Sequence, residues 1–152
     1  KQDQEDTYFD QYVDLFYHSA LDVMETMAGL NRHKARMEVV SPYQPQGDLF
    51  VSIQLVGDLK GEVVFGFSKE LALHLLETMT GMEQHELDEL VQSALCELTN
   101  IACGNAATAL VKRGLSCDIK TPQLSLQPPC CQDGTGVRVD TGSGMMSVGV
   151  LM

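Results

Sequence analysis

Hydrophobic positions recur at steps of three and four residues in three parts of the chain, which is the spacing of one helix face. The predicted helices cover residues 8–29, 69–80 and about 83–113. Glycines at the ends of these segments favour the left-handed conformation that terminates helices, and Ser68 can cap the second helix at its start. The third helix is predicted to open with an acidic stretch, residues 83–89, because carboxylates favour the positive end of the helix dipole.

The remaining hydrophobic positions alternate or cluster as they do in strands. The predicted strands cover residues 37–41, 49–56, 62–67, 117–126, 137–141 and 145–151. Short glycine-containing turns join the second strand to the third and the fifth to the last, so each of these pairs is expected to form a hairpin. Pro122 interrupts or edges the strand at 117–126, since proline cannot donate a hydrogen bond to a neighbouring strand.

The order helix, strands, helix, helix, strands predicts an α+β fold, with an antiparallel sheet and three helices, two of them long, packed on one face. The 152 residues suit a single domain, 1–152, which can bury about two thirds of its unfolded surface without disulfides or metals. Ser19-Ala-Leu in the first helix recurs as Ser93-Ala-Leu in the third, and each copy opens a half made of a helix followed by strands. This is a hint of an internal repeat, with coincidence as the competing explanation.

Composition changes the picture mainly by excluding partners. The formal net charge is −11, which argues against nucleic acid and anionic membrane surfaces as partners. No apolar run reaches the ~18 residues of a membrane span, and the first residues are polar and acidic, so neither a membrane segment nor a signal peptide is expected. Reduced thiols in a cytoplasmic protein are the expected state of the five cysteines.

The cysteines nevertheless offer one competing function. Cys130 and Cys131 are adjacent in the sequence, and such a pair could be redox active. No closely spaced cysteine pair of the zinc-binding type is present, and the four histidines do not sit near the cysteines. A redox or metal-responsive protein is therefore kept as a rival hypothesis.

The third predicted helix carries an unusual group of polar and small residues. Glu97 and Asn100 are three apart and so lie side by side, while Ser93 lies one turn before Glu97 and Gly104 one turn after Asn100. A glycine inside a helix costs about 0.5–1 kcal/mol relative to alanine, which suggests a close approach by another surface. The same pattern also fits an ordinary solvated helix face, and the glycine also suits close packing of the helix on the sheet.

The sequence around these residues resembles the active helix of the CheC/CheX family of chemotaxis phosphatases. The family pattern has Asp or Ser, then Glu four residues on, then Asn three residues further, which here is Ser93, Glu97 and Asn100. Twenty-one residues separate Asn100 from Pro122, a spacing shorter by one residue than that of the family. The order of the predicted helices and strands is also similar over nearly the whole chain.

Members of the CheC type often carry two such helices. Aligning the first helix to the third on the shared Ser-Ala-Leu places Val23 and Thr26 at the positions of Glu97 and Asn100. A chain with one active helix resembles CheX more than CheC.

The resemblance implies a substrate, the phospho-aspartate of a response-regulator receiver domain such as phosphorylated CheY. It implies that Asn100, whose amide both donates and accepts, holds the attacking water in line. Glu97 would anchor the helix to the receiver's lysine through a charge-assisted hydrogen bond, and Ser93 and Gly104 would lie in the contact. The Mg²⁺ of such a reaction belongs to the receiver, so no metal or other cofactor is expected on this chain.

Half of such an active site lies on the partner, which predicts that Glu97 and Asn100 are exposed and agrees with the lack of a pocket motif. The resemblance also implies a homodimer joined through sheet edges, for which the C-terminal strands are the candidates. The alternative is a non-catalytic adaptor or flagellar-switch-like module that binds receiver domains. Asn100 argues against this alternative, because docking alone does not require that residue.

Overall fold

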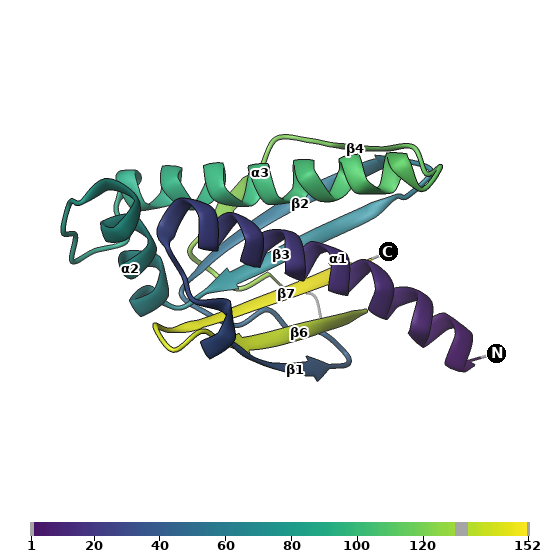
Figure 1. Cartoon of the computed structure of the whole chain (residues 1–152), viewed down its shortest axis with the longest axis horizontal. Coiled ribbons are helices and arrows are strands. Elements are labelled where there is room, and N and C mark those ends of the chain that lie inside the picture. The colour runs from purple at the N-terminus through teal and green to yellow at the C-terminus, as the bar shows by residue number, and fades with distance from the viewer. Residues whose placement is uncertain (1, 130–133, 152) are drawn as a thin grey trace.

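Two layers make up the fold, an antiparallel sheet and a layer of helices that covers one of its faces (Figure 1). The structure is a computed structural model, and it describes residues 2–129 and 134–151 of the 152. The helices are α1 (Gln2–Ala28), the short 3-10 helix η1 (Arg32–Lys34), α2 (Lys69–Thr80) and α3 (Glu89–Lys112). The strands are β1 (Arg36–Val40), β2 (Leu49–Gly57), β3 (Gly61–Phe67), β4 (Cys117–Ile119), β5 (Gln123–Ser125), β6 (Thr135–Asp140) and β7 (Met145–Leu151). The predicted α+β class and the order of its helices and strands are confirmed.

The strands form one sheet in the order β1-β6-β7-β3-β2-β4, with β5 also paired to β2, and its pairs are antiparallel. The order has a simple symmetry. One half of the chain contains α1, β1 and the β2–β3 hairpin, and the other contains α3, β4, β5 and the β6–β7 hairpin. Each half adds its outer strand to the hairpin of the other, since β1 pairs with β6 and β4 pairs with β2. The hint of an internal repeat therefore corresponds to a real repeat of topology.

The register of that repeat differs from the one the sequence suggested. α1 and α3 lie side by side over the sheet (Figure 1). Ser19 is buried but Ser93 is exposed, and Val23 is buried but Glu97 is exposed. The alignment on Ser-Ala-Leu is therefore wrong by one residue, and a shift of one residue makes the buried and exposed positions of the two helices agree. Three matching letters were too few to set the register, because burial depends on which side of each helix meets the sheet.

The core lies between the helices and the sheet. Alternate residues of the central strands point into it, as the two-residue period of a strand requires, and those of β2 include the fully buried Val51 and Ile53. Phe65 of β3 and Val148 of β7 continue the same layer across the sheet. α3 packs on the β2 side of this apolar layer, and α1 packs over β6 and β7.

Two helix starts differ from the prediction. α3 begins at Glu89 rather than at residue 83, because the Asp88 side chain caps it by accepting a hydrogen bond from the Val91 amide at 3.1 Å. The acidic residues 83–87 precede the helix. α1 begins at Gln2, ahead of the predicted residue 8, since its first residues are polar and carry no apolar spacing to detect. The predicted left-handed glycine after α3 is confirmed, with φ of 88° at Gly114.

The predicted strand at 117–126 is two short strands, β4 and β5, on the same neighbour. Ile119 pairs with Leu55 of β2, whereas Gln123 pairs with Ser52, so three residues on this side face two on β2. This extra residue is a β-bulge around Pro122, where a proline has no amide hydrogen to donate. Ile119 and Leu124 are five residues apart, so in an unbroken strand they would point to opposite faces of the sheet. The extra residue of the bulge places both on the face that packs against the core under the helices.

On the other face of the sheet, the loop after β1 covers the β6–β7 hairpin with Tyr43. The ring is fully buried over Gly136 and Gly149, which pair directly with each other in the sheet. The Tyr43 hydroxyl donates a hydrogen bond to the Val64 carbonyl at 2.9 Å and lies 3.0 Å from the Ser147 hydroxyl. The loop after β1 is therefore anchored to β3, β6 and β7.

The C-terminal strands do not lie at a sheet edge, contrary to the expectation that made them candidates for a dimer contact. β6 lies between β1 and β7, and β7 lies between β6 and β3, so the C-terminal strands have neighbours on both sides. The outer strands of the sheet are β1 on one side and β4 with β5 on the other. Sequence order does not reveal this, because β1 and the C-terminal hairpin are far apart in the chain.

Candidate functional site

The predicted site residues lie on α3, which packs against α1, α2 and the strands β2, β4 and β5. Its inward side carries small and apolar residues together with one threonine. The buried set comprises Val91, Leu95, Leu98, Thr99, Ala102, Cys103, Ala106, Ala107 and Leu110. The Thr99 hydroxyl donates to the Leu95 carbonyl at 2.8 Å, so this buried polar group is satisfied within the helix. Packing on several elements makes α3 a rigid support for whatever its outward side presents.

The structure brings the four predicted residues together on that outward side. Ser93 and Glu97 are exposed, and Asn100 and Gly104 are partly exposed. The helix is unbroken from Glu89 to Lys112, so the spacings of three and four residues keep all four within one sector of the helix. The predicted exposure is confirmed for Glu97, while Asn100 is more buried than expected.

The side chains of Glu97 and Asn100 have no partner among the residues that the structure describes. Among the residues that the structure describes, Glu97 takes part in no ion pair, and the side chains of Glu97 and Asn100 form no hydrogen bonds. A carboxylate and an amide that are open to solvent and unpaired are free to bind a partner.

The equivalent positions of α1 behave differently. Once the register is corrected, Asp22 and Glu25 stand where α3 has Glu97 and Asn100. Arg32 of η1 lies against them, with its Nη2 2.8 Å from an Asp22 oxygen and its Nε 3.9 Å from a Glu25 oxygen. The expectation of one active helix per chain is consistent with this arrangement, because α1 has no amide at the second position and its first carboxylate is paired.

Gly104 has room for a side chain. A methyl group at this position would meet only the Ile119 Cδ1 atom, at 4.0 Å, which is an ordinary van der Waals contact. Close packing of the helix on the sheet therefore does not require this glycine. Of the two explanations considered for this glycine, a close approach by another surface is the one that agrees with the structure. The neighbour Ile119 was not foreseen, because it comes from β4 and no local pattern links it to the helix.

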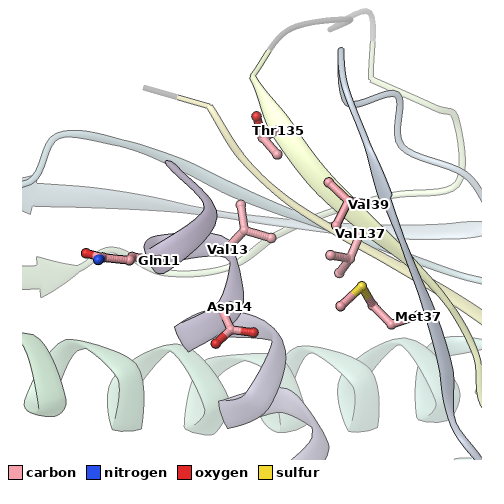
Figure 2. Close-up of a pocket in the computed structure, with 7 residues that line it drawn as sticks. All are labelled: Gln11, Val13, Asp14, Met37, Val39, Thr135 and Val137. Atoms are coloured by element: carbon pink, nitrogen blue, oxygen red, sulfur yellow. The ribbon is translucent and has the colours of Figure 1, made fainter. Parts of the chain in front are cut away.

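The four residues form a surface and line neither of the two clefts found elsewhere. The larger cleft, of about 330 Å³, lies between α1 and β1 (Figure 2). Its lining residues are Gln11, Val13, Asp14, Met37, Val39, Thr135 and Val137. The smaller, of about 130 Å³, lies on the opposite face of the sheet beside Gln46, Arg138 and Ser147.

The cysteines within the described ranges give no support to a redox or metal function. Cys96, Cys103 and Cys117 are free thiols, and burial raises the pKa of each, which lowers its reactivity near neutral pH. Cys130 and Cys131 lie outside the described residues. No group of three or more His, Cys, Asp or Glu side chains in the described part of the chain is arranged to hold a metal ion.

α3 is the one helix of residues 2–129 and 134–151 that is long and apolar enough to meet a length-and-hydropathy criterion for a membrane span. A core helix of a water-soluble protein meets the same criterion. Glu97 and Asn100 stand near the middle of α3, and its buried side is used by the core described above. α3 therefore meets the criterion because few of its residues are charged.

Comparison with known proteins bears directly on this helix. The model of the family described as chemotaxis phosphatase CheX matches residues 49–149, which include all of α3. A protein of Thermotoga maritima named CheY-P phosphatase CheX is 31% identical over 107 residues, covering 70% of this chain and 69% of that protein.

Solved structures show the same fold. A chemotaxis protein CheX from Vibrio vulnificus is 23% identical with a TM-score of 0.78, covering 93% of this chain and 98% of that one. The CheX chain of a CheX–CheY–BeF3–Mg²⁺ complex from Borrelia burgdorferi is 20% identical with a TM-score of 0.76, covering 92% and 96%. The family-model match and the Thermotoga relative, together with the Ser-Glu-Asn pattern on the outward side of α3, show that the chain belongs to the CheX family of chemotaxis phosphatases.

Proposed function

We propose that this protein hydrolyses the phospho-aspartate of a CheY-like receiver domain, using Asn100 and Glu97 of α3. The related protein of Thermotoga maritima is named a CheY-P phosphatase, and the Borrelia burgdorferi relative forms a complex with CheY. The observation that carries the proposal is the pair itself. A carboxylate and an amide, both without a partner among the described residues, lie side by side on the outward face of α3 in the family's spacing.

Asn100 positions the attacking water. Its amide cannot act as a base, but its oxygen accepts and its nitrogen donates, so it can hold a water in line with the phosphorus. The water oxygen then bonds to phosphorus, the bond to the aspartyl oxygen breaks, aspartate leaves as a carboxylate and the water's proton passes to the released phosphate. Such a transition state is loose, so correct placement contributes more than covalent assistance. Partial burial of Asn100 restricts its side chain and suits this role.

Glu97 anchors the helix on the receiver. It is more exposed than Asn100 and has no internal partner in the described part of the chain. A charge-assisted hydrogen bond from a receiver lysine to this carboxylate would align the neighbouring Asn100 with the phosphoryl group. Ser93 lies one turn away at the edge of the contact, and Gly104 leaves space for the receiver's backbone. The Mg²⁺ that such a reaction uses is expected on the receiver, where it neutralises phosphoryl charge.

Removal of the two side chains tests these roles separately. Asn100→Ala should lower the rate constant of receiver dephosphorylation by about 100-fold while leaving receiver binding nearly unchanged, since it removes an interaction made in the transition state. Glu97→Ala should weaken binding and hydrolysis together. The measurement is the decay of a phosphorylated receiver, with binding of the same receiver measured in parallel.

Two exposed residues provide matched controls, Asn105→Ala on α3 and Glu77→Ala on α2, and both should behave as wild type. An Asn100→Ala protein that hydrolyses at the wild-type rate would show that the mechanism is wrong. A wild-type protein that binds phosphorylated receivers but leaves their decay unchanged would instead identify a non-catalytic adaptor.

We also propose that the protein forms a homodimer through β1. β1 is an outer strand of the sheet, and its Met37 and Val39 side chains are 45% and 56% exposed beside the α1–β1 cleft (Figure 2). Pairing with β1 of a second copy would cover this apolar strip and satisfy the free strand edge. Because α3 packs over β2, β4 and β5 at the other side of the sheet, this contact leaves Glu97 accessible.

A further inference from the structure

The outward side of α3 has almost no charge. Between Leu90 and Val111 the helix carries a single charged residue, Glu97, in a chain of which 20% is charged and whose net charge is −11. A helix face that only meets water is normally covered by charged and polar side chains, with opposite charges often paired one turn apart. Between Leu90 and Val111 this side of α3 is polar, through Ser93, Asn100 and Thr108, but Glu97 is its single charged residue.

Apolar side chains stand at both ends of this side. Leu90 in the first turn is 40% exposed, and Val111 in the last turn is 55% exposed. At about 100° per residue, both fall in the same sector of the helix as Glu97 and Asn100. Between them, the Thr108 hydroxyl donates to the Gly104 carbonyl at 3.0 Å, so it already has a partner within the helix.

Single exposed apolar residues are common on protein surfaces and need no explanation. Here the two residues are arranged around the candidate site. Asn100 comes ten residues after Leu90 and eleven before Val111. With a rise of about 1.5 Å per residue, Leu90 and Val111 lie roughly 15 Å on either side of Asn100. The strip of α3 from Leu90 to Val111 is therefore roughly 30 Å long, which is the diameter of a small domain. A single domain whose reactive group faces Asn100 would therefore reach both ends.

We propose that Leu90 and Val111 are docking residues for the receiver domain, and that together they set its affinity. This inference rests on the proposed function. The partner it requires is a protein domain with apolar contacts at both ends of its interface and one cationic group near the middle, because Glu97 is the lone charge on the strip. Burial of two apolar side chains contributes affinity, while the central carboxylate fixes the orientation.

The test compares three proteins. They are wild type, a double variant that carries both Leu90→Ala and Val111→Ala, and the control Met145→Ala. The exposed fraction of Met145, 39%, is similar to the 40% of Leu90, but Met145 lies in β7 next to the β6–β7 turn. The probe is a CheY-type receiver from the same organism, activated with beryllofluoride and Mg²⁺, and its dissociation constant is measured by titration. Hydrolysis of the phosphorylated receiver is followed in parallel, and circular dichroism checks that each variant is folded.

We expect the double variant to bind about tenfold more weakly, with a raised KM and a nearly unchanged kcat, and Met145→Ala to match wild type. Equal binding by the double variant and wild type would overturn the docking inference and leave the proposed hydrolysis standing. Weaker binding by the double variant, with no hydrolysis by wild type, would support docking and overturn the phosphatase proposal. If wild type fails to bind the activated receiver, both are overturned.

Discussion

At the scale of single residues, pairing decides which carboxylate is available. Asp22 and Glu97 occupy equivalent exposed positions on the two long helices, but Arg32 neutralises Asp22, whereas Glu97 has no such partner in the described part of the chain. An exposed ion pair of this kind contributes little to stability, about 0–1 kcal/mol. Its larger consequence is that Asp22, unlike Glu97, is not a free anchoring charge.

Gly104 gives a prediction at this scale. Replacing it with alanine should stabilise the protein by about 0.5–1 kcal/mol, because alanine is the better helix former and the new methyl group meets only the Ile119 side chain at an ordinary distance. If the receiver approaches α3 closely here, the same change should slow dephosphorylation. Urea unfolding and receiver decay measure the two effects. A variant that is more stable and fully active would show that Gly104 is no part of the contact.

At the scale of elements, both faces of the sheet are covered by packed residues. Helices cover one face, and on the other the Tyr43 loop ties β3, β6 and β7 together. The glycine pair in β6 and β7 leaves the space that the aromatic ring fills. Strands weakened by glycines are therefore reinforced by a residue from a distant loop.

Gly149→Ala should destabilise the protein by about 1–3 kcal/mol, because the added methyl group would overlap the Tyr43 ring and force it from its site. The midpoint of urea unfolding is the readout. Gly104→Ala is the natural comparison, since it makes the same chemical change where space exists. Equal stability of the two variants would contradict the packing described for Tyr43.

At the scale of the whole molecule, buried titratable groups link stability to alkaline pH. Burial raises the pKa of the Cys103 thiol above its ordinary value of 9.0 and that of the Tyr43 hydroxyl above 10.0. Between the unfolded and folded pKa values the unfolded chain has lost protons that the native protein keeps, so the unfolding free energy falls as pH rises. Below pH 9 the contribution of these two groups to the unfolding free energy is fully present.

We therefore expect the free energy of unfolding to decline above pH 9, as measured by urea denaturation at a series of pH values. Lysines also titrate in this range, so Cys103→Ala serves as the internal reference. Its curve should fall less steeply than that of wild type between pH 9 and 10. Parallel curves would mean that Cys103 titrates alike in the folded and unfolded states.

The proposed dimer also belongs to this scale. Sedimentation should give a mass of twice 16.7 kDa for wild type. Val39→Glu should shift the mass toward that of the monomer, because it places a charge among the exposed apolar side chains of β1. Because Val39 is 56% exposed, folding should be retained. A wild-type monomer at micromolar concentration, or a dimer unaffected by Val39→Glu, would contradict the β1 interface.

The sequence by itself determined those features of the protein that depend on residues a few positions apart. The bounds of α2 and β7 agree with the prediction, because a capping serine, a terminal glycine and a tight turn act within a few residues. The side-by-side placement of Glu97 and Asn100 follows in the same way from the pitch of a helix. The class of fold could be predicted on these grounds, whereas the candidate site was singled out by the resemblance of Ser93, Glu97 and Asn100 to the family pattern.

Tertiary structure alone decided everything that depends on distant residues. It placed β1 rather than the C-terminal strands at the sheet edge and showed room beside Gly104. It also paired Asp22 with Arg32 and left Glu97 unpaired among the described residues. Burial, strand order and ion pairing join groups that are far apart in the chain, and no local spacing encodes which of two similar carboxylates will be left free.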